Sequence, residues 1–562
     1  MNRLLFFLLL FCFSICIYAQ KLTAPLDIPL YLSGNFGELR SNHFHSGLDF
    51  KTQGTIGHPV SAVKAGFVSR IYVGPYGFGR AVYINHPDGT TSVYGHLERF
   101  APKIESAVRD SQYVNESFSV NLIFSAGQFP VKQGEVIAYS GNNGDSGGPH
   151  LHFELRNTET EKAVDPLPEF KTRVKDSRPP EIRGLAFFPQ QGKGIVNGSV
   201  NTQIINVIKN KKGQYALAKP VKAWGTIGVG IKAYDKMNAV SNIYGVKEIQ
   251  LRVNNTEVYH SVMDGFYFSE TRYINSFIDW NEWKTHQAFF MKSFIDPGNK
   301  LGIYRSHSNG LISIQESKTY SCEYILKDAY GNTTTFSFNI IGEKRPIPDG
   351  KKKGVLFSYN RNNEYNGSGM TLTVPEGSLY NDIYINPNII KDNLYNGLIT
   401  SFAPIYSFGE RAPLQSYCSL TLSITNDSYP DKSKYGIVSV NNNKFAWLGG
   451  KYISSKLTTQ IQELGKFTVT IDTVPPVVVP QNPDKWTVNK RISFKIWDEL
   501  SGIDFYQGRL DGKFALFEYD AKTRSLFCDY DAKRMKTGKQ TLTLVVRDRA
   551  NNETRKDYEV VF

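Results

Sequence analysis

The chain has 562 residues and a formal net charge of +13, and 41% of its residues are hydrophobic and 13% aromatic. At about 150 residues per domain, this length predicts several domains. Scattered basic residues and the lack of a nucleic-acid-binding motif argue against a nucleic-acid partner and leave an anionic membrane surface or wall polymer as an acidic partner. Abundant aromatic residues and glycine favour strands and turns over helices.

The first 19 residues have the pattern of a secretory signal peptide. Arg3 precedes an apolar run from Leu4 to Ile17, and Ala19 is the small residue before the expected cut. The run is shorter than the ~20 residues that cross a bilayer, so a retained anchor is the less favoured alternative. Because no later stretch resembles a transmembrane helix, we expect an exported protein without a stable transmembrane anchor. It would act in a periplasm, at the cell surface or outside the cell.

Three cysteines remain once a signal peptide is removed, namely Cys322, Cys418 and Cys528. They are far apart and odd in number, so neither a disulfide framework nor a cysteine zinc site is expected. We predict isolated, buried thiols.

Short strands broken by glycine run from Leu22 to about Val174. Asp88-Gly89 separates two alternating runs, which predicts a hairpin in an antiparallel sheet. The stretch from Leu97 to Pro130 is longer and less regular, and we interpret it as a loop that forms a lid or a groove wall. A double proline, Pro179-Pro180, marks the end of this unit.

Histidines gather at the strand ends of this unit. His150 and His152 occupy alternate positions of one strand, so both imidazoles project from the same face. His45 and Asp49 bracket a glycine at which the strand can bend. Together with one of the two histidines they can complete a three-ligand zinc site. His96 directly follows another strand, where the turn glycine Gly95 is expected to leave it open to solvent.

Three motifs together resemble the lysostaphin-type zinc metallopeptidases, which cut the cross-bridges and stem peptides of bacterial peptidoglycan. The motifs are His45-Ser46-Gly47-Leu48-Asp49, Tyr94-Gly95-His96-Leu97 and Gly147-Gly148-Pro149-His150-Leu151-His152-Phe153-Glu154. The resemblance covers residues 30 to 170 and implies that His45, Asp49 and His152 bind zinc. It also implies that His96 and His150 line the reaction centre. The stretch from Leu97 to Pro130 exceeds the minimal family core, which leaves the substrate open.

The chemistry of such a site follows from its ligands. Two imidazoles and one carboxylate leave a position open at zinc for water, and zinc lowers the pKa of that water to about 7. One of His96 and His150 takes a proton from the water and the other donates to the developing oxyanion, and the sequence leaves open which does which. Glu154 either orients a ligand histidine or forms an ion pair. The loop Asn142–Gly148 is expected to set access and specificity.

Other polar residues of the unit have weaker indications. We interpret His43, His58 and His86 as structural or surface residues. Arg80 and Asn85 are candidates for contact with the substrate.

The remainder of the chain contains an internal repeat. Two pairs of segments resemble each other, each behind a double proline: Ile231–Asp235 with Phe494–Asp498, and Ile325–Asn332 with Val545–Asn552. Strands that end at an aspartate turn in corresponding places predict two related immunoglobulin-like β-sandwich modules. The first carries an aromatic-rich insertion, Tyr267 to Leu311, with a short helix.

We therefore expect an all-β, multidomain chain, in which an antiparallel metallopeptidase domain precedes immunoglobulin-like modules. The predicted parts are a signal peptide (1–19), the metallopeptidase domain (20–175), a β-sandwich with insertion (176–345), a β-rich middle domain (346–472) and a second β-sandwich (473–562).

The function expected from the resemblance is that of an exported zinc endopeptidase of peptidoglycan peptides. A catalytically silent, wall-binding regulator or adaptor is the alternative. A third possibility is an adhesin or polymer-binding protein whose β-modules carry the function, either by tethering the chain to an anionic wall polymer or by covering the groove.

Overall fold

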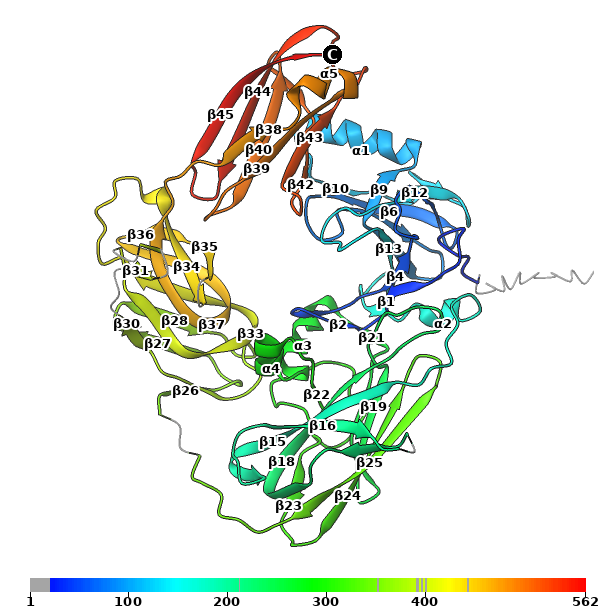
Figure 1. The fold of residues 1–562 in the computed structure, drawn as a ribbon. Helices are drawn as coiled ribbons and strands as arrows, with labels where there is room; N and C mark the ends of the chain where they lie inside the picture. Colours follow the sequence, from blue (N-terminus) through cyan, green and yellow to red (C-terminus); the bar gives the residue numbers. More distant parts are fainter. Residues whose placement is uncertain are drawn as a thin grey trace, which may run out of the picture.

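The computed structural model describes residues 21–211, 213–350, 353–390, 394–395, 398–399, 402–441 and 444–562. The expected signal peptide, residues 1–19, lies outside the described residues. Strands dominate, as predicted, and four β-rich units are arranged as a ring in which the last unit lies beside the first (Figure 1). Within the described part of the chain, no helix has the length and apolar character needed to cross a membrane.

An antiparallel sheet forms the centre of the first unit. Its strands lie in the order β1 (Leu32–Gly34), β4 (Leu48–Lys51), β13 (His150–Asn157), β8 (Thr90–Gly95), β7 (Arg80–Asn85), β6 (Gly66–Val73) and β10 (Val120–Ile123). The predicted hairpin at Asp88-Gly89 is confirmed, because β7 and β8 pair antiparallel with Asn85 opposite Thr91. A smaller sheet, β5 (Pro59–Ser61), β12 (Val136–Ser140) and β9 (Leu97–Phe100), lies beside it.

The pairing of β13 with both of its neighbours brings the motifs together. His152 lies opposite Asp49 on β4 and opposite Gly95 on β8. The alternate residues Leu151 and Phe153 are fully buried in the core on the other face. Two-residue periodicity therefore puts the histidines on one face and the apolar anchors on the other.

The interpretation of residues 97–130 as a loop is wrong. The segment contains β9, the helix α1 (Pro102–Val114) and β10. Proline is favoured in the first turn of a helix, and the buried side chains of Ile104 and Val108 are four residues apart, so one narrow face packs on the core. The remaining residues of the helix are largely polar, which hid this pattern in the sequence.

The second unit is built around a larger sheet. Its main strands lie in the order β17 (Tyr215–Leu217), β16 (Gln203–Lys209), β15 (Glu181–Val196), β18 (Val221–Tyr234), β25 (Thr333–Gly342), β24 (Thr319–Lys327), β19 (Glu248–Val253) and β20 (Thr256–Val262). The β18–β25 pair is parallel. The insertion contains the expected short helix, here η1 (Phe268–Tyr273), α3 (Ile274–Phe277) and α4 (Trp280–His286).

The second unit completes the core of the first. Met237 and Tyr244 belong to the same hydrophobic cluster as the core of the first unit. A strand pair also links the two units, because β14 (Ala163–Val164) pairs with β21 (Gly265–Phe266).

Two further β-units follow. The third has its main strands in the order β27 (Asn363–Gly367), β28 (Met370–Val374), β33 (Ile405–Ser423), β37 (Lys456–Ile471), β34 (Tyr435–Asn441) and β35 (Lys444–Gly449). The last has two four-stranded sheets, β38 (Val477–Pro480), β39 (Arg491–Trp497), β43 (Ser525–Asp529), β42 (Glu518–Asp520) and β41 (Lys513–Ala515), β40 (Ile503–Leu510), β44 (Lys539–Asp548), β45 (Glu553–Val561). The three cysteines are free and buried, as predicted.

The last unit packs against the first and closes the ring. Leu516 is part of the first unit's hydrophobic cluster. The Phe514 ring lies edge-on to that of Tyr113 on α1, at 5.4 Å between centroids. Glu518 forms ion pairs with Arg80 at 2.6 Å and with Arg109 at 3.1 Å.

Candidate metal centre and active site

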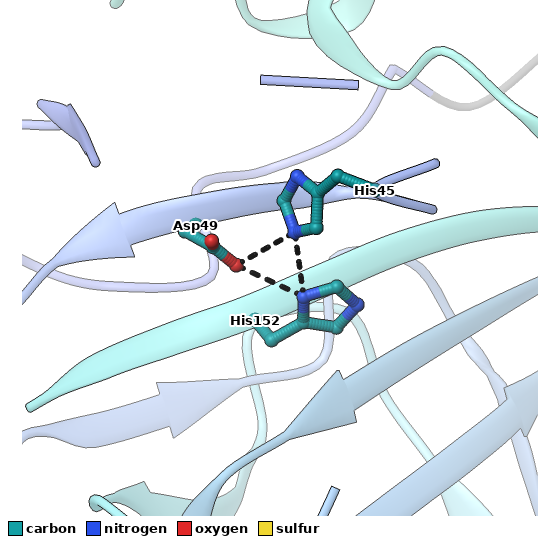
Figure 2. Close-up of side chains that lie close together, drawn as sticks. All are labelled: His45, Asp49 and His152. Carbon is teal, nitrogen blue, oxygen red and sulfur yellow. Dashed lines mark hydrogen bonds and ion pairs between the residues drawn. The ribbon is translucent and has the colours of Figure 1, made fainter. Parts of the chain in front are cut away.

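Three side chains of the first unit converge on one point (Figure 2). Nε2 of His45 and Nδ1 of His152 each lie 2.9 Å from Oδ1 of Asp49, and the two nitrogens are 3.1 Å apart. All three residues are buried, with exposures of 7%, 3% and 7% for His45, His152 and Asp49. Two nitrogens and one oxygen in such proximity form a donor set of the kind that zinc prefers.

The outer nitrogen of each histidine has an oxygen partner. Nδ1 of His45 donates to the backbone carbonyl of Asn35 at 2.7 Å, and Nε2 of His152 lies 2.9 Å from Oε1 of Glu154. These contacts leave the inner nitrogens as the ones that present lone pairs to a metal. The residues therefore fit a metal ion.

Glu154 realises both of the alternatives left open by the sequence. Its Oε1 faces His152, and its Oε2 accepts a hydrogen bond from Nε of Arg156 at 2.6 Å. Ser46 also donates to Oε1. Burial opposes the charge of the carboxylate, but Arg156 and His152 outweigh it and lower the pKa of Glu154 to about 2.

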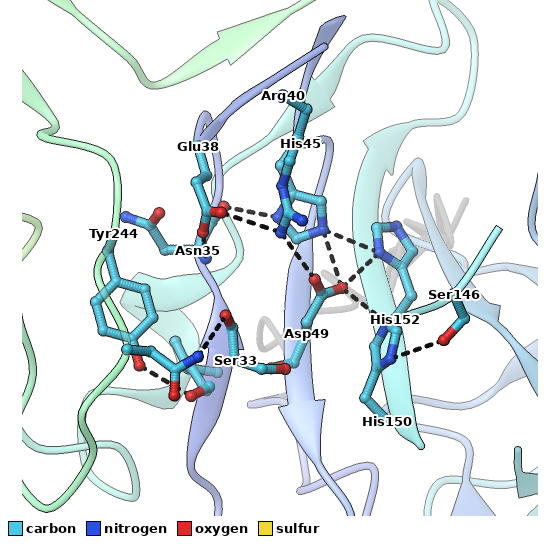
Figure 3. A network of polar contacts seen from close by, with 12 residues as sticks. Ser33, Asn35, Glu38, Arg40, His45, Asp49, Ser146, His150, His152 and Tyr244 are labelled. Atoms are coloured by element: carbon cyan, nitrogen blue, oxygen red, sulfur yellow. Dashed lines mark hydrogen bonds and ion pairs between the residues drawn. The ribbon is translucent and has the colours of Figure 1, made fainter. Parts of the chain in front are cut away.

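Asp49 is held from both sides (Figure 3). Its Oδ1 faces the histidines, and its Oδ2 accepts from Nη2 of Arg40 at 3.3 Å. Burial works against ionisation, yet His45, His150 and His152 keep the pKa of Asp49 well below its usual range. Asp49 is therefore a carboxylate throughout the neutral range.

His96 and His150 lie next to each other beside this cluster. Their ring centroids are 4.7 Å apart, and Nε2 of His150 is 3.4 Å from Oδ1 of Asp49. Nδ1 of His96 donates to the carbonyl of Asn143 at 2.8 Å, and Nδ1 of His150 donates to that of Gly148 at 2.8 Å. Because Nδ1 carries a proton in each of these bonds, Nε2 is the nitrogen of each ring that can exchange a proton with its surroundings.

The expectation that His96 is open to solvent is wrong, because the residue is only 7% exposed. This environment keeps His96 uncharged. Burial first, and then the neighbouring His152 and His150, lower the pKa of His96 to about 3. Its backbone has the left-handed conformation, with φ of 58°. His96 is thus a neutral imidazole at physiological pH, in a backbone conformation that few residues adopt.

The loop Asn142–Gly148 positions both of these histidines and is itself held from two sides. Gly144 and Gly79 approach so closely that a Cβ on Gly79 would lie 2.5 Å from the backbone of the loop. On the other side, Nζ of Lys522 from the last unit donates to the carbonyls of Asn142 and Ser146. The last unit therefore contacts the loop whose carbonyls bind His96 and His150.

Two suggestions about substrate contacts are not supported by the geometry. Arg80 donates to the Glu98 carbonyl at 2.7 Å and pairs with Glu518, so it belongs to the interface with the last unit. The Asn85 side chain accepts from Ser69 and Thr91 within the sheet.

Two of the other histidines of the first unit lie away from the metal centre in structural or surface positions. His86 is buried and bonded within the sheet, while His43 is exposed and bonded to the carbonyl of Ser41. Sequence reasoning missed Asn35 and Arg40, since no motif marks them. Asn143 lies in a loop already singled out by its glycine- and asparagine-rich composition.

Two family profiles match this chain, and one of them covers the residues of the site. The profile of peptidase family M23 matches residues 43–121 and 113–166, a range that includes all five predicted site residues. The profile of the Zu5-like domain matches residues 354–472.

Several known proteins are similar to part of this chain. A protein named uncharacterized metalloprotease from Haemophilus influenzae is 37% identical over 124 residues, which cover 22% of this chain and 20% of that protein. The DD-carboxypeptidase/endopeptidase Mpg of Neisseria meningitidis is 33% identical over 120 residues, or 21% of each chain. Lysostaphin of Staphylococcus simulans is 29% identical over 131 residues, covering 23% and 22%. The chain thus spans about a fifth of the length of these relatives.

The family resemblance inferred from the three motifs is confirmed. The N-terminal unit of this chain is a lysostaphin-type metallopeptidase domain of family M23 with an intact His-Asp-His metal site, and it is followed by a Zu5-like domain and further β-sheet units.

Proposed function

We propose that the protein is an exported zinc endopeptidase that hydrolyses peptide bonds in the stem peptides or cross-bridges of bacterial peptidoglycan. The observation that carries the proposal is the convergence of His45, Asp49 and His152, with the outer nitrogen of each histidine already bonded. The relatives named as an endopeptidase and as lysostaphin support the choice of substrate. The signal-peptide pattern of residues 1–19 supports export.

Metal binding, proton transfer and orientation of the water are assigned to different residues. A zinc ion held by His45, Asp49 and His152 would act as a Lewis acid toward water and the scissile carbonyl. We assign the proton transfer to His150, because its Nε2 lies 3.4 Å from Oδ1 of Asp49, at the edge of the metal site. His96 stays neutral, and its Nε2 accepts a hydrogen bond that orients the attacking water. The proton taken up at Nε2 of His150 is then available to the leaving amine.

We further propose the division into residues 1–19, 20–175, 176–345, 346–472 and 473–562. The Zu5-like match over residues 354–472 supports the fourth part. The paired four-stranded sheets of the last part support an immunoglobulin-like sandwich there, and the internal repeat extends this assignment to residues 176–345. An anionic wall polymer is the proposed ligand of these units.

A catalytically silent adaptor is the second candidate function. It is favoured by the contact of Lys522 with the loop beside the site, which a regulatory unit would make.

Zinc content tests the proposed metal site. Purified protein should hold about one zinc per chain, and His45→Ala should lose it. His43→Ala is the matched control, because His43 is two residues away and exposed. A folded His45→Ala protein with full zinc content would refute the ligand assignment.

A further inference from the structure

Three aspartates meet where the M23 domain joins the second unit. Asp176 lies between α2 (Leu167–Phe170) and β15, while Asp235 and Asp328 directly follow β18 and β24. One carboxylate oxygen of each lies within 4.8 Å of the others. This donor set contains oxygen alone, which suits Ca²⁺ and differs from the nitrogen-rich set at the zinc site.

Unpaired oxygens distinguish this cluster from an ordinary acidic group. Asp235 is 1% exposed, and its Oδ1 has no hydrogen-bond partner. Oδ2 of Asp176 is likewise buried and without a partner. A buried carboxylate oxygen without a donor is costly, and two of them in one cluster point to a cation as the missing partner.

Basic side chains do not supply the missing charge. Arg178 and Lys236 are close in sequence to Asp176 and Asp235, but both form ion pairs with Glu181. Among the described residues, no lysine or arginine lies within ion-pair distance of the three aspartates. Burial and the charge of Asp328 raise the pKa of Asp235 to about 8, as expected of carboxylates that repel one another.

The internal repeat provides a contrast. Asp472, Asp498 and Asp548 form the corresponding group in the last unit. There, Asp498 accepts from the amides of Leu500 and Gly502, and no oxygen of the group is left buried and unpaired. The corresponding acidic group is thus satisfied by the protein alone, whereas Oδ1 of Asp235 and Oδ2 of Asp176 are not.

We propose that Asp176, Asp235 and Asp328 bind one Ca²⁺ ion at the junction of the M23 domain and the second unit. The ion ties together the linker and the ends of two strands. It also anchors a segment that reaches the zinc site. Asp235 and Tyr244 exchange two backbone hydrogen bonds of 2.9 and 3.0 Å, and the next residue, Gly245, holds the side chain of Asn35.

Calcium titration of the zinc-loaded full-length protein tests the proposal. The protein is stripped of metal with a chelating resin and reloaded with zinc alone before millimolar Ca²⁺ is added, and bound calcium and thermal unfolding are then measured. We expect the Tm to rise by about 5 °C at saturation. Asp235→Asn should bind one calcium fewer per chain and lose that shift, while the exposed Asp27→Asn should behave like the wild type.

The competing explanation is that the carboxylates of the cluster share a proton. It predicts the opposite effect of Asp235→Asn on stability. In that case the wild type binds no calcium, and Asp235→Asn is as stable as the wild type or more stable, with or without Ca²⁺. Either result would overturn the proposal. A variant that failed to fold would leave the wild-type calcium measurement as the deciding one. Peptidase activity is not a readout, so the outcome is independent of the proposed function.

Discussion

The backbone carbonyl of Asn35 accepts a hydrogen bond of 2.7 Å from Nδ1 of the metal ligand His45. The side chain of Asn35 is in turn bonded at both ends to the backbone of Gly245 in the second unit, at 2.9 Å each. Gly245 of the second unit therefore positions Asn35, and Asn35 orients the metal ligand His45. The second unit is part of the support of the site, in addition to any role as a tether.

Replacing Asn35 with alanine should weaken zinc binding. The change removes the Asn35 partner from the half-buried amide and carbonyl of Gly245 and loosens the carbonyl that orients His45. We expect zinc affinity to fall by about 10-fold to 100-fold. Competition with a chromogenic chelator measures this, and His43→Ala serves as the control. Unchanged affinity in a folded Asn35→Ala protein would show that the contact does not orient His45.

Glu154 should make the stability of the zinc-free protein depend on acidic pH. Its pKa falls from an ordinary value of 4.5 to about 2 in the folded protein. Because the folded-state pKa is the lower one, the carboxylate stabilises the fold above about pH 4.5, and this stabilisation is lost as the pH falls toward 2.

The Glu154→Gln variant isolates this contribution. Without the carboxylate, Arg156 keeps only its ion pair with the exposed Glu161, and the free energy of unfolding at pH 7 should fall by about 1–3 kcal/mol. Urea denaturation at pH 7 and pH 3 would show a smaller difference between variant and wild type at the lower pH. An equal difference at both pH values would contradict the assignment.

An isolated fragment of residues 20–175 should be less stable than the same domain in the full chain. It lacks Met237 and Tyr244, which complete its hydrophobic core. A fragment of residues 20–345 restores both, so we expect it to unfold cooperatively with zinc bound while the shorter fragment does not. Calorimetry and zinc analysis compare the two. Identical behaviour would show that the second unit adds nothing to the domain.

The ion pairs of Glu518 should hold the last unit on the M23 domain. Glu518→Gln leaves Arg80 buried without its counter-charge, and we expect a loss of about 3 kcal/mol and faster proteolysis between residues 472 and 477. Glu553→Gln, at an exposed site in the same unit, is the control. If both variants resist proteolysis equally, the docking does not depend on Glu518.

The parts of the site that follow local periodicity were predictable. His150 and His152 share a strand face because side chains alternate along a strand, and the three motifs identify the family. The helix α1 was not predictable in the same way, since its apolar face is reduced to a few residues such as Ile104 and Val108.

Contacts between distant segments could not be predicted from one sequence. Asn35 and Gly245 are 210 residues apart, and neither belongs to a motif. The role of Arg80 depends on Glu518, a further such pair, 438 residues apart. In both cases the two residues meet because whole units pack against each other. No local sequence pattern predicts that packing.

Digestion of purified peptidoglycan sacculi tests the central claim most directly. The zinc-loaded wild type should release peptide fragments that mass spectrometry assigns to one class of peptide bond. His150→Ala should retain zinc but cleave about 10²-fold to 10⁴-fold more slowly, because it lacks the proposed proton carrier. Wild-type protein that holds zinc yet releases no fragments, or His150→Ala protein that cleaves at the wild-type rate, would contradict the account.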